Sequence, residues 1–217
     1  MKKSIIFTIT TLLVFINSVT SVSALTVLPY WYSTDNKIAW YTDTSLYYSH
    51  DDNDCGMDDQ DMNSYVVDGV EIWDNILDPS YLKLDPLFAD IPVVCLTRSQ
   101  ATAKGISSLA HGATAVTRNT SYSNSYSKPT GGTVYFYEMI DSTIYLVWDT
   151  TVGTTIKTSD YSSEKWTSIT MHEFGHSIGY LGHHPTTNHL MYKIYNGVYT
   201  APTYQDKLQM YLVYDAE

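Results

Sequence analysis

A short stretch toward the C-terminus restricts the fold of this chain more than any other feature. Residues 172–176, His-Glu-Phe-Gly-His, fit the pattern HExxH, and positions i and i+4 of an α-helix lie on the same face. His172 and His176 can therefore reach one metal ion at about 2.0–2.1 Å, and Glu173 can accept a proton from a water bound to that metal. The pattern predicts a helix that carries two metal ligands on one face.

A third ligand must come from outside this helical turn, because a catalytic zinc usually takes three protein ligands and one water. The only glutamate downstream of the motif is Glu217, at the end of the sequence, so His183 is the better candidate. In an unbroken helix His183 would lie about 10.5 Å beyond His176 along the axis. We therefore expect the helix to end between them. Gly179 and Gly182 suit such an end, because glycine readily adopts positive φ.

With these residues the sequence resembles the metzincin clan of zinc endopeptidases, whose signature is HExxHxxGxxH followed by a methionine-containing turn. The clan's usual spacing places the third histidine at position 182, which here is Gly182. We interpret His183 as this ligand after a one-residue insertion, since Gly182-His183 is similar to the pair that ends the motif in matrixin-like members. His184 is the alternative ligand. Met191 resembles the methionine of the clan's Met-turn, which lies under the imidazoles and is not a ligand.

The resemblance implies an α+β fold, a metzincin-like zinc peptidase domain. Such a domain has a twisted, mostly parallel sheet, a long helix, an active-site helix and a C-terminal helix. Hydrophobic periodicity predicts strands at 37–43, 81–84, 91–97, 112–118, 133–140 and 143–149, the last two paired around Asp141-Ser142, and helices at 58–77 and 163–178. Residues 204–214 resemble the closing helix of matrixin-like domains.

Two segments bear on how a substrate would lie. The family comparison implies a substrate extended along an edge strand, and residues 143–149 are the candidate edge. Residues 119–132 are polar and rich in turn formers, so we expect a surface loop there, either mobile or at the rim of the cleft. His111 and His189 have no evident partner in the sequence and are interpreted as structural.

The N-terminus has the three parts of a secretory signal peptide: Lys2 and Lys3, an apolar run, and small residues ending at Ala24. The apolar run is too short for a permanent anchor. We expect residues 1–24 to be removed and residues 25–217 to form a single secreted, extracellular domain, a monomer without a stable membrane anchor. The formal net charge of −11, which loss of the leader makes more negative, argues against a nucleic-acid partner.

Two further features allow more than one interpretation. Cys55 and Cys95 are the only cysteines and predict either a disulfide, as expected of an exported chain, or a free buried pair. The acidic residues between 50 and 61 offer the oxygen ligands that Ca²⁺ takes. They do not fit the EF-hand spacing, and carboxylates at a helix start are also favoured by the helix dipole. Calcium is thus a weaker hypothesis than Zn²⁺.

Together these features predict a secreted zinc-dependent endopeptidase that acts on protein or peptide substrates. In this hypothesis a zinc-bound water attacks the peptide bond, with Glu173 as general base and His172, His176 and His183 as ligands. The alternative from another class is an exported metal-containing binding module, such as an adhesin or inhibitor, that retains the metal without turnover.

Overall fold

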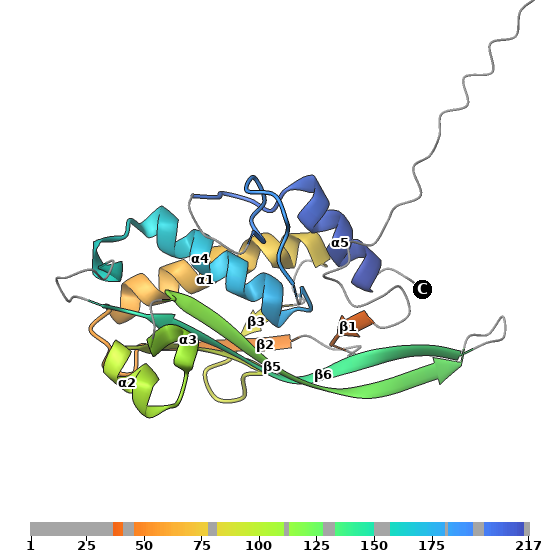
Figure 1. Cartoon of the computed structure of the whole chain (residues 1–217), viewed down its shortest axis with the longest axis horizontal. Helices are drawn as coiled ribbons and strands as arrows, with labels where there is room; N and C mark the ends of the chain where they lie inside the picture. The colour runs from red at the N-terminus through yellow and green to blue at the C-terminus, as the bar shows by residue number, and fades with distance from the viewer. Residues whose placement is uncertain are drawn as a thin grey trace, which may run out of the picture.

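A computed structural model describes residues 37–40, 46–77, 82–110, 113–127, 133–149, 157–180, 182–192 and 198–214. In this part of the chain, three longer helices lie over one face of a twisted sheet, and two strands form a long hairpin at its side (Figure 1). The helices are α1 (Asp59–Leu77), α2 (Arg98–Ala103), α3 (Ser107–Ala110), α4 (Ser163–Ser177) and α5 (Tyr204–Tyr214), with one 3-10 turn at Thr158–Asp160.

The six described strands form one mixed sheet. They are β1 (Lys37–Ala39), β2 (Leu46–Asp51), β3 (Leu82–Leu84), β4 (Ile91–Leu96), β5 (Ala115–Ser127) and β6 (Thr133–Val147). Along the sheet the order is β1-β6-β4-β2-β3, and all of these neighbours are parallel. Only β5 is antiparallel, and it pairs with β6. The expectation of an α+β fold with a mostly parallel sheet is confirmed.

The hairpin of β5 and β6 differs from the sequence prediction in three ways. Residues 119–127, expected in a loop, belong to β5, while residues 128–132 lie outside the described part. The two strands expected around Asp141-Ser142 are one continuous strand, β6, in which these residues pair with Thr120 and Asn119. Residues 144–147 pair with β4 on one side and residues 143–146 pair with β5 on the other, so the candidate edge is wrong. Among the described strands, β5 pairs with β6 alone.

Strand β2 and the short helices α2 and α3 were not predicted from the sequence. β2 lies between β3 and β4, and only Leu46 and Tyr48 of this strand are buried, which gives a weak alternation. α2 and α3 follow β4. At the start of α2 the Thr97 hydroxyl accepts from the backbone N–H of Gln100, whose side chain accepts from the Thr97 N–H. This capping box was present in the sequence as Thr-x-x-Gln.

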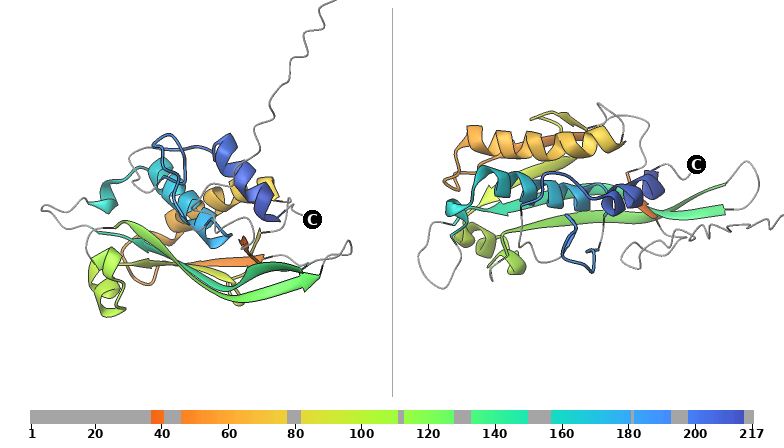
Figure 2. Two further views of the ribbon diagram at one scale, coloured as in Figure 1. Left: turned by 45° about the vertical axis from the view of Figure 1, so that its right-hand side comes forward. Right: turned by 90° about the horizontal axis from the view of Figure 1, so that it is seen from above.

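The two faces of the sheet carry different clusters of apolar side chains. Alternate residues of a strand point to opposite faces, so Val93 and Cys95 belong to the main core under α1 and α4, whereas Leu96 belongs to a smaller cluster. That smaller cluster includes Ala101 of α2 and Leu109 of α3. The short helices therefore cover the opposite face at one end of the sheet, as Figure 2 also shows.

α1 fixes the position of α4 through a close helix contact. A Cβ on Gly69 would lie 3.0 Å from the backbone nitrogen of Met171, so glycine permits the approach of the two helices. One turn further along α1, the indole Nε1 of Trp73 donates a hydrogen bond of 2.7 Å to the Met171 carbonyl oxygen. From the other side, Trp40 Nε1 donates to the carbonyl oxygen of Ser177 at 2.8 Å. The middle and the C-terminal end of the predicted active-site helix are thereby tied to the core.

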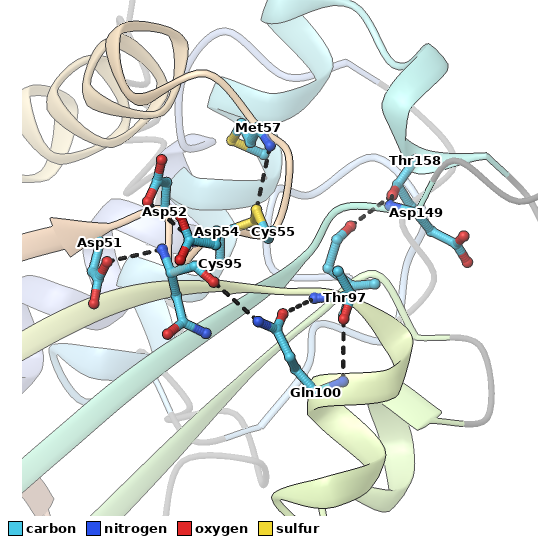
Figure 3. Close-up of a disulfide and its surroundings, with 12 residues drawn as sticks. Asp51, Asp52, Asp54, Cys55, Met57, Cys95, Thr97, Gln100, Asp149 and Thr158 are labelled. Carbon is cyan, nitrogen blue, oxygen red and sulfur yellow. Dashed lines mark hydrogen bonds between the residues drawn. A yellow bond between two sulfur atoms is a disulfide. The ribbon is translucent and has the colours of Figure 1, made fainter.

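A disulfide joins Cys55, in the segment before α1, to Cys95 in β4 (Figure 3). Of the two interpretations of these cysteines, the disulfide is confirmed. The two residues are 40 positions apart, and in the chain-entropy model a loop of this length stabilises the folded state by about 4 kcal/mol. The bond ties the start of α1 to the centre of the sheet.

The acidic segment beside the disulfide uses its carboxylates for local structure. Asp51 Oδ1 accepts from the backbone N–H of Asn53 at 2.8 Å, and Asp58 Oδ1 accepts from that of Gln60 at 2.9 Å (Figure 3 shows Asp51). Among the described residues, the one group of three or more candidate ligands within reach of a shared ion consists of histidines elsewhere in the chain. The calcium hypothesis therefore gains no support from the arrangement of these carboxylates.

The predicted signal peptide, residues 1–24, and His111 lie outside the described residues. Within the described part, no helix combines the length and apolar character required to cross a bilayer.

Candidate metal centre

The motif helix α4 begins at the predicted residues. Ser162 is the N-cap, and its hydroxyl accepts from the backbone N–H of Lys165 at 3.4 Å. Glu164 lies in the first turn, where its charge is favourable to the helix dipole. The helix then runs through the core with almost every side chain from Trp166 onward buried. The HExxH residues therefore lie on a rigid element.

α4 ends at Ser177, between His176 and His183, as expected if both histidines bind one metal. Gly179 has φ of +119°, and its backbone N–H donates to the His176 carbonyl oxygen at 3.2 Å. The N–H of Tyr180 donates to the Gly175 carbonyl oxygen at 2.8 Å. Gly179 is thus the glycine that turns the chain, and Gly182 is not among the described residues with positive φ. Residue 181 lies outside the described part.

The turn brings His183 back to the two helix histidines. One nitrogen from each of His172, His176 and His183 lies within 4.8 Å of the other two. The ring of His183 is 5.4 Å from that of His172 and 4.9 Å from that of His176, between centroids. His172 is buried, His176 half-buried and His183 exposed, so the group opens to solvent at His183. These three side chains could hold a metal ion.

Backbone carbonyls fix the tautomers of the two helix histidines. His172 Nδ1 lies 2.6 Å from the carbonyl oxygen of Leu190, and His176 Nδ1 contacts that of Tyr180. A carbonyl oxygen can only accept, so each Nδ1 carries the proton, and in a neutral ring Nε2 is then an acceptor. Hydrogen bonds of this type orient metal-ligating histidines in general.

The consequence is a pair of acceptor nitrogens that face each other. His172 Nε2 and His176 Nε2 are 3.2 Å apart. Burial lowers the pKa of His172, and burial together with the neighbouring His172 and His183 lowers the pKa of His176 well below its usual range. Both rings are therefore neutral at pH 7, and neither Nε2 carries a proton that could form a hydrogen bond between them. Two lone pairs at this distance favour a cation between them.

His184, the alternative third ligand, has other contacts. Its ring stacks on that of His189 with centroids 3.3 Å apart, and its Nδ1 accepts from the backbone N–H of Thr186 at 3.2 Å. His189 in turn contacts the Thr203 hydroxyl through Nδ1 at 2.8 Å. The structure thus groups His183, and not His184, with the helix histidines. His189, interpreted as structural, has in Thr203 and His184 the partners that the sequence did not reveal.

Met191, expected under the imidazoles from the resemblance, packs against the motif helix. It is fully buried, and its sulfur would lie 2.5 Å from a Cβ placed on Gly175, which stands next to His176 in α4. The preceding carbonyl, that of Leu190, is the one that orients His172. The carbonyl of Met191 accepts from the N–H of His184 at 2.7 Å. The turn with Leu190 and Met191 therefore packs against α4 and fixes the tautomer of His172.

Substitution of Gly175 by alanine tests this contact. At an open helix position the change would stabilise the fold by about 1 kcal/mol. Here we expect it to lower the free energy of unfolding, because overpacking costs about 1–3 kcal/mol and the new methyl group would overlap Met191 and touch Trp73. Urea unfolding of the variant and the wild type measures the difference. An increase in stability would show that the methionine does not lie against this helix.

Glu173 is buried on the side of α4 that faces β5. The hydroxyl of Thr117 in β5 lies 2.6 Å from Glu173 Oε2 and 3.0 Å from the Glu173 carbonyl oxygen. Burial raises the pKa of Glu173 to about 7, against the lowering effect of the hydrogen bond from Thr117. A carboxylate with this pKa can both accept and release a proton at neutral pH, as a general base and acid must.

The polar residues of β5 that contact α4 were not predicted from the sequence. Besides Thr117, the side-chain Nδ2 of Asn119 donates to the carbonyl oxygen of His176 at 2.9 Å. Asn119 was placed in the expected loop. The two residues are separated by one position and so share a face of β5. Two polar residues at i and i+2 are a weak signal, since they occur on the exposed face of many strands.

Comparison of the sequence with protein-family models and with curated proteins finds no match. The resemblance to metzincins therefore depends on the motif residues and on the geometry described above.

Proposed function

We propose that this protein is a secreted zinc-dependent endopeptidase of metzincin-like, matrixin-like architecture. His172, His176 and His183 are the metal ligands in this proposal, Glu173 is the general base, and Met191 lies under the centre without binding it. The observation that carries the proposal is the approach of His172 Nε2 and His176 Nε2 to 3.2 Å with both Nδ1 atoms bound to carbonyl oxygens.

The donor set fits zinc. Two nitrogens that bind one ion tetrahedrally at about 2.0–2.1 Å are separated by about 3.3 Å, close to the observed spacing of the Nε2 atoms. Three neutral imidazoles with one open side are the arrangement of catalytic zinc sites, whereas structural sites are usually closed shells rich in cysteine. Both cysteines of this chain are joined in a disulfide away from the histidines. The exposed side of His183 supplies the open position.

The chemistry divides between the ion and the protein. A bound zinc ion would polarise the scissile carbonyl and acidify a water. Glu173 takes the proton of the attacking water and later delivers it to the leaving amine. Its burial suits this role, because a carboxyl with a pKa of about 7 exchanges a proton readily near neutral pH.

An extended substrate fits beside β5. This strand pairs only with β6 among the described strands, and it carries Thr117, which touches the general base. An extended peptide can add to such an edge through backbone hydrogen bonds. β5 replaces residues 143–149 as the strand along which we propose that the substrate lies.

Export is supported by the disulfide. Disulfides persist in oxidising compartments, and the bond between Cys55 and Cys95 is consistent with one. Together with the predicted leader at residues 1–24, this bond supports an extracellular protein.

Zinc removal provides the test. The protein without residues 1–24 is purified, its zinc content is measured, and cleavage of an unfolded protein is followed before and after treatment with a zinc chelator. We expect cleavage to cease without zinc and to return when Zn²⁺, but not Mg²⁺, is added. Cleavage that survives complete zinc removal would contradict the proposal. Absence of cleavage by folded, zinc-loaded protein would favour the metal-containing binding module.

A further inference from the structure

The contact between β5 and the general base is unusually direct. The Thr117 hydroxyl has one proton, and its two nearest acceptors, Oε2 at 2.6 Å and the carbonyl oxygen at 3.0 Å, both belong to Glu173. The shorter contact goes to the carboxylate. A hydroxyl that touches both the side chain and the backbone of one residue restricts the rotation of that side chain.

A second contact fixes β5 against the same helix. Asn119 Nδ2 donates to the His176 carbonyl oxygen at 2.9 Å, and Asn119 Oδ1 accepts from the Ser142 hydroxyl of β6 at 2.6 Å. Ser142 is fully buried. The pairing of β5 with β6 shifts register just beyond this point, between Thr120 and Ser121. The half of β5 that carries Thr117 is thus held to α4 at two positions.

We propose that Thr117 is a positioning residue for the general base. Its hydroxyl holds Oε2 of Glu173, so that Oε1 takes the proton from water and gives it to the leaving amine. Because Thr117 belongs to the strand along which we place the substrate, the strand that aligns the peptide also orients the carboxylate. This inference rests on the proposed peptidase function and assigns a role that the motif HExxH does not contain.

Kinetics of two variants test the role of the hydroxyl. Thr117→Val removes the hydroxyl and keeps a branched side chain. We expect kcat for an unfolded protein substrate to fall by roughly 10- to 100-fold, within the contribution of a well-placed general base, while KM and zinc content stay within about twofold. Thr117→Ser restores the hydroxyl, and kcat should return to within about threefold of the wild type. A Thr117→Val variant that keeps its kcat within about twofold overturns the proposal.

A matched control separates positioning from packing. Thr143 lies in the adjacent strand β6 and is also half-buried. It pairs with Arg118, the residue next to Thr117 in β5. Thr143→Val makes the same chemical change without touching Glu173, and kcat should stay within about twofold. An equal loss of kcat in Thr143→Val and Thr117→Val would show that loosening of the sheet is the cause and would overturn the proposal.

A measurement without turnover distinguishes this inference from the proposed function. Urea unfolding of the metal-free wild type, Thr117→Val, Glu173→Ala and the double variant forms a double-mutant cycle. If the two side chains are hydrogen-bonded, the double variant's unfolding constant should differ at least about fivefold from the product of the single effects. If the effects of the two single substitutions on the unfolding constant simply multiply in the double variant, the contact itself is overturned. If the two residues are coupled but the wild-type protein cleaves no substrate, the proposed peptidase function and the catalytic role of Thr117 are overturned. The contact between the two side chains then still stands.

Discussion

Replacing Glu173 with alanine is expected to lower kcat by about 10²- to 10⁴-fold, the usual contribution of a general acid–base group, while zinc content stays unchanged. The metal should remain because the group of candidate ligands consists of the three histidines and does not include this carboxylate. The fold should also remain, since the change removes a buried ionisable group whose raised pKa reflects the cost of burial. Steady-state cleavage and metal analysis of the same preparation measure both effects.

Glu164 offers a matched control for this prediction. It lies in the first turn of the same helix and is exposed, so Glu164→Ala removes a carboxylate from α4 without reaching the centre. We expect wild-type kcat from this variant. Loss of zinc in Glu173→Ala would show instead that the glutamate binds the metal, and full activity would remove it from the mechanism.

Replacing His183 with alanine should abolish tight metal binding. Loss of a residue that merely orients a ligand typically costs 10- to 100-fold in metal affinity, so we expect the loss of a ligand to cost more than about 100-fold. Competition with a chromophoric zinc chelator measures the affinity. Cleavage at a limiting zinc concentration should fall in parallel.

His184→Ala is the control, because the sequence alone could not choose between the two neighbouring histidines. His184 stacks on His189 and binds Thr186, so its removal should lower the free energy of unfolding while zinc binds within about tenfold of the wild type. The reverse pattern, with zinc lost in His184→Ala and kept in His183→Ala, would show that the turn rearranges around the metal.

The motif helix and its end were accessible to sequence reasoning because they follow from local rules. The i, i+4 spacing of His172 and His176, the cap at Ser162 and the positive φ of Gly179 each depend on a few adjacent residues. The same holds for α1, which matches the predicted range within one residue. α5 covers the residues in which the resemblance implied a closing helix. The turn at Gly179 also brings His183 to the helix histidines, although its position departs by one residue from the metzincin spacing.

The hairpin of β5 and β6 was not accessible in the same way, because strand pairing is a long-range interaction. Residues 119–127 are rich in serine and asparagine and resemble a loop when considered alone. Their strand conformation depends on β6, which supplies a continuous antiparallel partner. The contact of Thr117 with Glu173 was missed for the same reason, since it joins residues 56 positions apart. The stacking of His184 on His189, five positions apart, corresponds to neither the helix nor the strand period and was missed on that account.

The three candidate ligands all lie between residues 172 and 183, on the end of one helix and the turn that follows it. An ion bound there would close only a short loop, and the entropy gained by closing a loop grows with its length. The fold does not depend on closure of this loop by the ion, since the disulfide and the contacts of α1 with α4 hold distant segments together. Exposure to a zinc-poor medium should therefore be a reversible event, from which the protein recovers by rebinding the ion without refolding.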